Sequence, residues 1–579
     1  MMNRLRSKEA GYSLITTMLV ITIFFLLGLT VLSVAIQQAR VTEVRVEDVE
    51  SLHEAKTALD EAIGTLKAKL SAEPNQSFFT EHQIFSPADL DRFLNDVQNE
   101  LKQQYDVSWK DISYDEYNIP TNKVFIRAVD LSKTFADGSR QRTVKRRVFL
   151  TNTPSFLKYA LGSKENVIIN GGAYIEQGDV YAGNEAYVSN ATNYIRRDGT
   201  LETAHVNGGL AASAPGAIWY VNSGLLSCNN QEQCYKREGG RFIRQRDFFS
   251  AGWPENAAGP VVQKENEDFI DVDFDWTVKD KLLNAAGISP VNDQQEYVNW
   301  INNETYQTPQ QLADQLKKEG FFTVIVKNDD TPIAQIINDT TQQTDRPLWL
   351  EGDIDIADFD SLTIKTNGDE KQWLIVNGNL RLYGPSTKSA DSSTVRGNLI
   401  VFGNLELHGN ISFNSTVYVL GTTYIYNAKI SEADQKELVL LSKGMLDIAR
   451  INEFENPDTA NLTPNLKGYF YTDNNATIYA VGSYLYIEGG LFARGGGICP
   501  RDNDWSSCAP DADLSGLVIN AFRGQVQEQN DEPGQLERSD EQRASRLIVK
   551  YNPNVLVDQG EGLPFVHTLS LVVEELVVQ

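Results

Sequence analysis

The sequence predicts a mainly β protein with a long N-terminal helix, a small α/β head and a parallel β-solenoid (β-helix) body that carries an inserted subdomain. Three observations predict this fold class. A charge-free run at residues 12–36 continues into a charged segment with helical periodicity. Strand-like runs separated by turn residues occupy 107–150, and short Gly- and Asn-punctuated strands recur from about residue 156. The expected segments are a basic leader (1–11), the helix (12–74), the head (75–155), the solenoid start (156–214), the inserted subdomain (215–346) and the solenoid body (347–579).

The first helix is predicted to span a membrane. Tyr12 to Ile36 is a run of 25 residues without a charged side chain, which at about 1.5 Å per residue can cross a bilayer. The leader carries Arg4, Arg6 and Lys8 against one acid, and positive flanks stay in the cytoplasm. We therefore expect a single-pass protein with a cytoplasmic N-terminus and an extracellular body. A cleaved secretory signal fits less well, because the run is long and no small-x-small site closes it.

The helix is expected to continue beyond the membrane. Apolar residues recur at helical spacing between Glu and Lys after residue 50: Leu52, Ala55, Leu59, Ala62, Ile63, Leu66 and Leu70. The head should then follow with a helix opened by Ser86-Pro87 and with strands at 107–114, 123–129 and 142–150.

The body is predicted from the spacing of its glycines. Gly397, Gly403 and Gly409 are six residues apart, with alternating apolar and polar residues between them. Gly and Asn tolerate positive φ at the corners of a solenoid, and each turn buries its apolar face only by stacking on the next. An antiparallel β-sandwich is the alternative, but its strands usually recur at 8–12 residues. Residues 215–346 lack this spacing and hold a helix at 308–320, which begins at the N-cap Thr308.

Two parts of the chain resemble known families. The basic leader ending in Gly11, the aromatic Tyr12, the apolar helix and its amphipathic continuation resemble the type IV pilin superfamily, and most closely PilX-type minor pilins and their Gram-positive relatives. The resemblance implies cleavage of Gly11-Tyr12 by a prepilin peptidase and association with other pilin-like subunits. Thr16 departs from the pattern, since pilins usually carry Glu at that place. The order FLKYAL, LKGYFYTD, SYLYIEGGLFARG, LVINAFRG and LIVKYNP is similar to large PilX-like pilus-assembly proteins.

The charge and the cysteine content limit the classes of partner and ligand that the chain can bind. The formal net charge is −26 and the sequence pI is about 4.7, which argues against nucleic acid as a partner because phosphates need a basic face. The four cysteines form two close pairs, Cys228/Cys234 and Cys499/Cys508. Outside the cytoplasm such pairs are expected to close local disulfides. Zinc and free thiols are the alternatives, although no His lies near either pair.

No cofactor is expected, with one reservation for Ca²⁺. The segment 499–513, which contains the second cysteine pair, carries four acids, Asp502, Asp504, Asp511 and Asp513, and oxygen ligands at short spacing can hold Ca²⁺. No complete EF-hand, nucleophile elbow, P-loop or HExxH pattern is present. The acids on strands, such as Asp353 and Asp355, are expected on a solvated face.

Tyrosines two residues apart share a strand face. Tyr469 and Tyr471 form one such pair, and Tyr484 and Tyr486 form another. Two interpretations stay open: an exposed tyrosine ladder that binds a glycan or a cell-surface protein, or tyrosines that only pack between rungs.

The function expected from these observations is structural or adhesive. The chain is predicted to be a membrane-tethered, minor-pilin-like surface component of a type IV pilus or pseudopilus of a bacterium, and not an enzyme. The alternative is a signal-anchored, polysaccharide-active β-helix enzyme.

Overall fold

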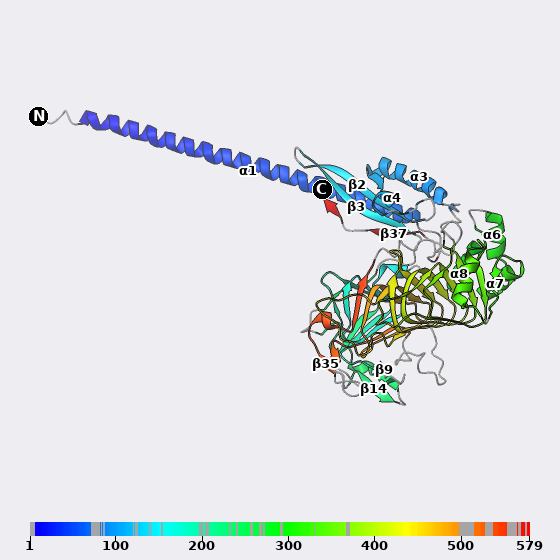
Figure 1. Ribbon diagram of the computed structural model, residues 1–579. Helices are drawn as coiled ribbons and strands as arrows, with labels where there is room; N and C mark the ends of the chain where they lie inside the picture. The colour runs from blue at the N-terminus through cyan, green and yellow to red at the C-terminus, as the bar shows by residue number, and fades with distance from the viewer. Residues whose placement is uncertain are drawn as a thin grey trace. The chain divides into compact units, whose positions relative to one another are not determined.

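The computed structural model is mainly β, with an apolar N-terminal helix and most of its strands in one large sheet (Figure 1). The chain divides into two compact units: the head unit, Met1–Thr151 with Leu569–Gln579, and the body, Asn152–Thr568. The residues that the structure describes are 6–70, 82, 84, 87–117, 119, 121, 125–137, 140–151, 155–195, 201–202, 208–230, 233–238, 241–254, 259–265, 269, 272–289, 293–328, 330–365, 371–496, 515–526, 536–552, 564, 569–573 and 576–578.

Helix α1 (Arg6–Leu70) has two halves of different character. Its segment Thr16–Ala39 has a mean hydropathy of 2.8 and no buried part, and it is long and apolar enough to cross a membrane. The C-terminal half buries one stripe in the head: Ala55, Leu59, Ala62, Ile63, Leu66 and Leu70. The predicted helical periodicity of this stripe is thus confirmed, with Leu52 only half-buried.

The head packs α1 and a second helix on a five-stranded antiparallel sheet. Apolar residues of α3 at helical spacing (Leu90, Leu94, Val97 and Leu101) are buried. The long β2–β3 hairpin pairs Arg127 with Leu150 at one end and Asp137 with Arg140 at the other. The predicted strand at 107–114 is shorter than expected, because Ser113 begins helix α4. The elements are α3 (Pro87–Tyr105), β1 (Ser108–Asp111), α4 (Ser113–Tyr117), β2 (Arg127–Asp137), β3 (Arg140–Thr151), β37 (Ser570–Val573) and β38 (Val577–Val578).

Along the chain, the body is an insertion between two strands of the head, β3 and β37, and does not simply follow the head. Strand β3 leads into the body, and β37 returns to pair antiparallel with β3, from Val148 with Val573 to Thr151 with Ser570. The expectation that the body extends to residue 579 therefore differs from the structure. The last strands join a partner more than 400 residues earlier in the sequence, and local patterning does not encode such a pairing.

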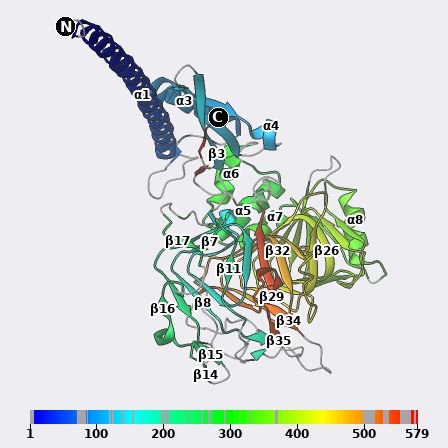
Figure 2. The same cartoon turned by 90° about the vertical axis from the view of Figure 1, so that its left-hand side faces the viewer.

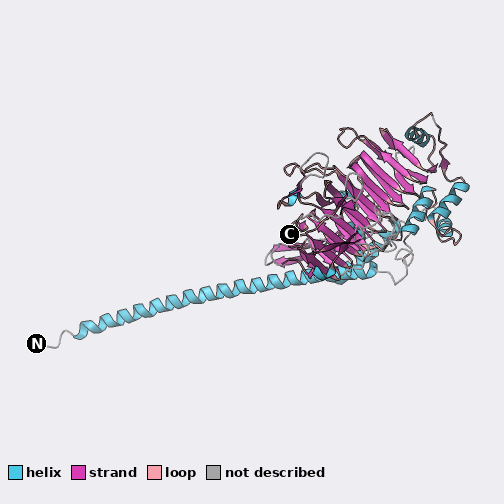
Figure 3. Cartoon of the chain, turned by 90° about the horizontal axis from the view of Figure 1, so that it is seen from below, coloured by secondary structure: helices cyan, strands magenta, loops and turns pink. Residues whose placement is uncertain are grey.

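The body contains a 27-stranded sheet whose strand pairs, apart from β13–β16, are parallel among the described residues (Figure 3). The pairs fall into three columns, each adding one strand per turn of the chain. Column one runs through β18 (Thr323–Val324), β19 (Leu348–Glu351), β22 (Trp373–Asn377), β25 (Asn398–Val401), the end of β26 (Leu405–Val419), β28 (Leu438–Ser442), β30 (Leu466–Thr472), β32 (Leu485–Ala493), β4 (Leu161–Ser163), β7 (Val180–Ala182), β12 (Ile218–Val221) and β17 (Val261–Gln263).

Columns two and three use the next strands of each turn. Column two runs through β20 (Ile354–Ala357), β23 (Leu380–Tyr383), β26, β27 (Thr423–Glu432), β29 (Leu446–Ala449), β31 (Ala476–Ala480), β33 (Gly516–Ala521), β5 (Asn166–Gly171), β8 (Glu185–Ser189), β13 (Gly224–Cys228) and the antiparallel β16 (Ser250–Ala251). Column three runs through β21 (Ser361–Thr363), β24 (Ser393–Arg396), β26, β27, β30, β32, β36 (Leu547–Tyr551), β6 (Tyr174–Gln177) and β11 (Ala212–Ser213).

The two Gly- and Asn-rich stretches of the sequence form one stack in the reverse of their sequence order. β33 pairs with β5 in continuous register, from Gly516 with Asn166 to Ala521 with Gly171. The later stretch therefore comes first in the stack, and the earlier stretch extends it. Strands β12 and β13 also belong to the columns, so the insertion begins later than the predicted residue 215.

The core lies between the columns, where alternate residues point inward. β20 shows the alternation, with Ile354 and Ile356 buried and Asp355 and Ala357 exposed. Leu, Ile and Val occupy most of the equivalent inward positions of later turns, with Thr423 and Ala476 among the exceptions. Each such side chain contributes roughly 1.5–3 kcal/mol when removed from water, so the stack is stabilised by repetition of one small contact.

Helices of the insertion cover the outward side of column one (Figure 2). Val278, Leu282 and Leu316 join the cluster that contains Trp349 and Tyr418 of the sheet. Thr308 caps its helix through a capping box, as the sequence predicts. Asp273 caps α5 by accepting from the Trp276 amide. The helices on this side are α5 (Phe274–Ala285), α6 (Gln294–Ile301) and α7 (Pro309–Lys318), whereas α8 (Ile333–Thr341) contributes Ala334 and Ile337 to the core between the columns.

The two ends of the stack differ. At the β21 end, Asn338 of α8 donates to the Ser361 carbonyl and accepts from the Thr363 amide, both at 2.8 Å, so this helix covers the open strand. At the other end β17 leaves Val261 60% and Val262 42% exposed. The remaining short elements are η1 (Ser155–Lys158), β9 (Tyr194–Ile195), β10 (Leu201–Glu202), β14 (Tyr235–Glu238), β15 (Arg241–Arg244), η2 (Arg246–Phe248), β34 (Gly524–Val526), β35 (Leu536–Arg538) and η4 (Gln542–Ala544).

Glycines of successive turns lie next to one another at the corner before column two. A Cβ added at Gly403 would lie 2.6 Å from the carbonyl carbon of Gly378, and one at Gly421 would lie 2.5 Å from the Gly403 oxygen. Gly403 does not have a positive φ, unlike the expectation that such corners need one. The glycine is required because successive turns approach closely. Beside it, Asn404 accepts the Thr422 amide at 2.8 Å, as Asn379 accepts the Asn404 amide.

This corner predicts the result of two alanine substitutions. Gly403→Ala should lower the free energy of unfolding by about 1–3 kcal/mol, because the added methyl overlaps backbone that cannot move alone. Gly482→Ala is the matched control, since its nearest neighbour, a Phe454 ring carbon, is 3.5 Å from the added Cβ. Denaturant unfolding of both variants measures the difference, and equal effects would contradict the close-approach explanation.

Candidate functional site

The predicted processing site lies within α1. Gly11 and Tyr12 are part of its helical backbone, five residues after the described chain begins. The side chains of residues 6–15 are outside the description, so cleavage at Gly11-Tyr12 stays a prediction.

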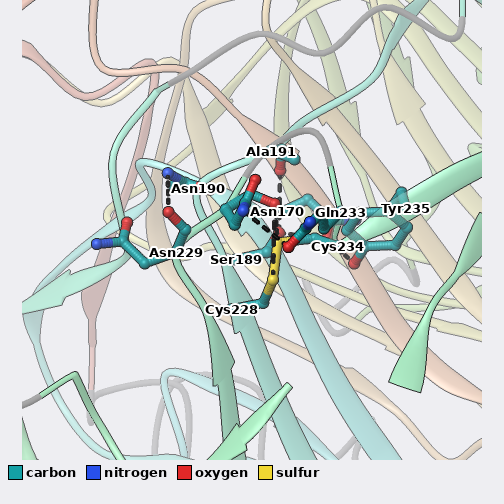
Figure 4. Close-up of a disulfide and its surroundings, with 10 residues drawn as sticks. Asn170, Ser189, Asn190, Ala191, Cys228, Asn229, Gln233, Cys234 and Tyr235 are labelled. Carbon is teal, nitrogen blue, oxygen red and sulfur yellow. Dashed lines mark hydrogen bonds between the residues drawn. A yellow bond between two sulfur atoms is a disulfide. The ribbon is translucent and has the colours of Figure 1, made fainter. Parts of the chain in front are cut away.

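Cys228 and Cys234 form a disulfide beside column two (Figure 4). Both sulfurs belong to buried residues, 2% and 0% exposed, so the bond lies in a packed interior. The neighbouring Tyr235 hydroxyl donates to the Asn170 side chain, and Ser189 donates to the same oxygen at 3.1 Å. The bond thus fixes a loop over buried polar groups. Cys499, Cys508 and the proposed Ca²⁺ ligands Asp502, Asp504, Asp511 and Asp513 lie outside the described residues, so these predictions remain untested.

The four tyrosines expected to form an exposed ladder are buried. Tyr469 and Tyr471 point outward from column one, but Phe156 of η1 packs on both, and the Tyr469 hydroxyl donates to the Phe156 and Tyr159 carbonyls. Tyr484 and Tyr486 pack with Ile548 at 7% and 5% exposure. The exposed-ladder interpretation is therefore wrong for these residues, because segments distant in sequence cover the strand faces. The packing interpretation describes them.

No group of three or more His, Cys, Asp or Glu side chains suited to a metal ion occurs among the described residues. Acidic side chains elsewhere in the body have structural partners. Asp275 pairs with Lys443 at 2.7 Å, and Asp353 accepts the Asn379 amide at 2.9 Å.

The outward side of column two instead brings together a row of charged residues. Asp355, Arg381 and Glu406 lie in register on successive strands. Arg381 donates through Nε to Glu406 and through Nη1 to Asp355, both at 3.0 Å, and the Glu406 and Asp355 carboxylates raise its pKa. These side chains remain in contact with solvent: Arg381 is 33%, Glu406 30% and Asp355 62% exposed.

A second outward row beside it is aromatic. Tyr383 stacks on His408 with ring centroids 5.0 Å apart and 9° between the planes, and His408 meets Tyr426 edge-on at 6.5 Å. On the other side of Tyr383 the register partner is Ala357, which is exposed. We call the six residues Asp355, Ala357, Arg381, Tyr383, Glu406 and His408 the Tyr383 ledge.

The charged row ends in a buried carboxyl group. Asp447 follows Tyr424 in register and is 2% exposed. Its Oδ2 accepts the Tyr426 hydroxyl at 2.5 Å, while Oδ1 has no hydrogen-bond partner among the described residues. Burial raises the pKa of Asp447 to about 7, and the Tyr426 hydrogen bond lowers it only in part.

Sequence reasoning missed both rows, although an indication was present. Asp355, Arg381, Glu406, Tyr424 and Asp447 each stand three residues after a corner glycine: Gly352, Gly378, Gly403, Gly421 and Gly444. Alignment of the turns on these glycines would have placed the five side chains on one face.

Comparisons with known proteins identify no family. No family model and no curated protein matches the chain. One similar solved structure is the competence-associated pilin ComZ from Thermus thermophilus, at 10% identity and a TM-score of 0.22, covering 78% of this chain and 81% of that one. At this TM-score the likeness carries no argument about fold or function.

The buried carboxyl group predicts a pH-dependent stability. Its pKa is higher in the folded than in the unfolded protein, so the folded state holds a proton that the unfolded state has lost between about pH 4 and pH 7. Stability should therefore fall as the pH rises through this window. Asp447→Asn should stabilise the protein by roughly 3–4 kcal/mol at about pH 8 and change little at about pH 4.

Thermal or denaturant unfolding at several pH values measures this effect. Asp330→Asn is the control, because Asp330 is exposed. A stability difference between Asp447→Asn and the unmodified protein that does not change with pH would refute the assignment.

Proposed function

We propose that the chain is an exported, membrane-tethered surface component of the minor-pilin kind, with a structural or adhesive role in a type IV pilus or pseudopilus. The observation that carries the proposal is the contrast within α1. The segment Thr16–Ala39 is apolar and wholly unburied, whereas the stripe from Ala55 to Leu70 is core. A bilayer removes the first surface from water, as the head removes the second.

The head supports the same reading. A long N-terminal helix packed by its C-terminal half on an antiparallel sheet is the arrangement that the resemblance to type IV pilins implies. Its N-terminus would remain cytoplasmic and the body extracellular. Thr16, in place of the usual Glu, removes the carboxylate that could meet a neighbouring N-terminus, which favours an accessory or tip position over the filament shaft.

The body would act as a rigid display element. Three columns of parallel strands, each gaining one strand per turn, support the interpretation as a parallel β-solenoid. Such a stack exposes strand faces at a fixed spacing of about 4.8 Å, suited to presenting side chains to another surface.

An enzymatic alternative has one observation in its favour. Glu406 and Asp447 stand two strands apart in one row and differ in environment, as an acid and a base require. Asp447, however, is 2% exposed, which leaves it out of reach of a polymeric substrate. We therefore favour the structural role.

Processing tests the proposal directly. If a prepilin peptidase cuts Gly11-Tyr12, mass spectrometry of the mature protein from its native host should find Tyr12 as the first residue. Gly11→Val should leave the leader attached, because a β-branched side chain replaces hydrogen at the cleaved bond. Gly28→Val, within the apolar segment, is the control and should be processed normally. A mature N-terminus elsewhere would refute the pilin assignment.

Truncation tests the division of α1. Deletion of residues 1–50 should yield a soluble, folded protein that no longer fractionates with membranes. The deletion removes the apolar segment 16–39, whose residues are all exposed, and it leaves the buried stripe of α1 intact. Deletion of residues 1–70 should unfold the head, since six buried apolar side chains are lost. Membrane fractionation and protease sensitivity distinguish the two. Membrane retention of the shorter deletion would contradict the tether.

A further inference from the structure

The geometry points to a saccharide-binding site on the Tyr383 ledge, where a neutral sugar ring would stack on Tyr383 above Ala357. This inference goes beyond the proposed tether and display role, because it concerns the ligand of one strand face. It stands on the end of the aromatic row, on polar groups with unused hydrogen-bonding capacity, and on the local charge.

The aromatic row stops at Tyr383. One face of its ring is covered by His408 at 5.0 Å, and the strand on its other side contributes only the methyl group of Ala357. Ala357 is itself exposed, so none of the residues that the structure describes covers the space above it. A flat aromatic face over a short side chain accepts an apolar surface whose C–H groups meet the electron-rich ring. The C–H face of a pyranose ring has this character.

Polar groups surround this ring face. Arg381 has five N–H donors, and only its Nε and Nη1 atoms donate among the described residues. The Tyr383 hydroxyl has no partner in the described part of the chain, and Asp355 is 62% exposed with one oxygen engaged. Each sugar hydroxyl can accept a hydrogen bond from the guanidinium donors and donate one to the carboxylate acceptors at the edge of the aromatic ring.

Charge selects the class of saccharide. Asp355 and Glu406 outnumber Arg381 on the ledge, and the chain carries a net charge of −26. A polyanionic glycan would be repelled by this field, whereas an uncharged one would not. The site therefore fits neutral hexose or N-acetylhexosamine units.

Further along column two, outward residues of the same two rows are buried. Tyr187 and Asn170 at outward positions are fully buried. The contrast matters because a merely structural row needs covering neighbours to gain packing energy, and the described part of the chain supplies none above Ala357 at the Tyr383 end. His408 packs on one face of the Tyr383 ring, and the other face of this ring remains open to solvent.

The test uses the full-length protein in a detergent without a sugar headgroup, since such a headgroup would compete. An array of neutral oligosaccharides derived from cellulose, chitin, mannan and galactan should contain ligands, whose affinity is then measured by titration calorimetry. Tyr383→Ala should weaken binding at least about tenfold. Ala357→Leu should do the same, because its side chain fills the space over the ring while the ring itself remains.

Ala357→Ser is the matched control and should bind within about twofold of the unmodified protein, since it leaves the ring face open. The Ala357 variants should unfold at the same temperature as the unmodified protein, because the position is exposed. Absence of any neutral ligand on the array, binding of acidic glycans or peptides instead, or equal binding by Ala357→Leu and Ala357→Ser would overturn the proposal. Membrane fractionation of the same variants tests the membrane tether separately. The saccharide-binding site and the tether can therefore be refuted independently of each other.

Discussion

The architecture of the body depends on one requirement: every strand must satisfy its backbone hydrogen bonds with the strand one turn away. Because parallel strands pair at a fixed spacing, each corner must bring two turns of backbone within contact, and glycine at 378, 403, 421 and 444 is the residue that permits it. Asn379 and Asn404 then complete the corner by accepting amides that the strands cannot pair. Register, side-chain rows and the inward apolar alternation all follow from this repeat.

Once register is fixed, the outward faces become free to differ. Column one carries large aromatic side chains because α5, α7 and η1 cover it. Column two carries charged and aromatic rows where no described residue covers it. Asp447 marks the boundary between the two conditions. It belongs to the same row as the solvated Arg381 and Glu406, yet its burial changes its acidity. Position along the stack, more than residue type, therefore sets the chemistry of each side chain.

Local patterns predicted much of this structure, and long-range pairing accounts for what they missed. The buried stripe of α1, helix α3 and the capping box of Thr308 follow from spacing within a few residues. The return of β37 to β3 and the pairing of β33 with β5 join segments hundreds of residues apart, which no local period reveals. The same limit explains the tyrosines: their shared strand face was predictable, but the η1 segment that covers Tyr469 was not. For the candidate site, the glycine spacing held the information, and only the alignment of turns was lacking.

The insertion of the body between β3 and β37 has a mechanical consequence. Both covalent links to the head leave from the interior of the stack, at β4 and just after β36, and each of these strands has neighbours on both sides. A pulling force applied through the head thus reaches two connections that share the load. It acts on strands held from both sides, which must be sheared free together, and the outermost strands, where peeling would otherwise begin, carry none of the force.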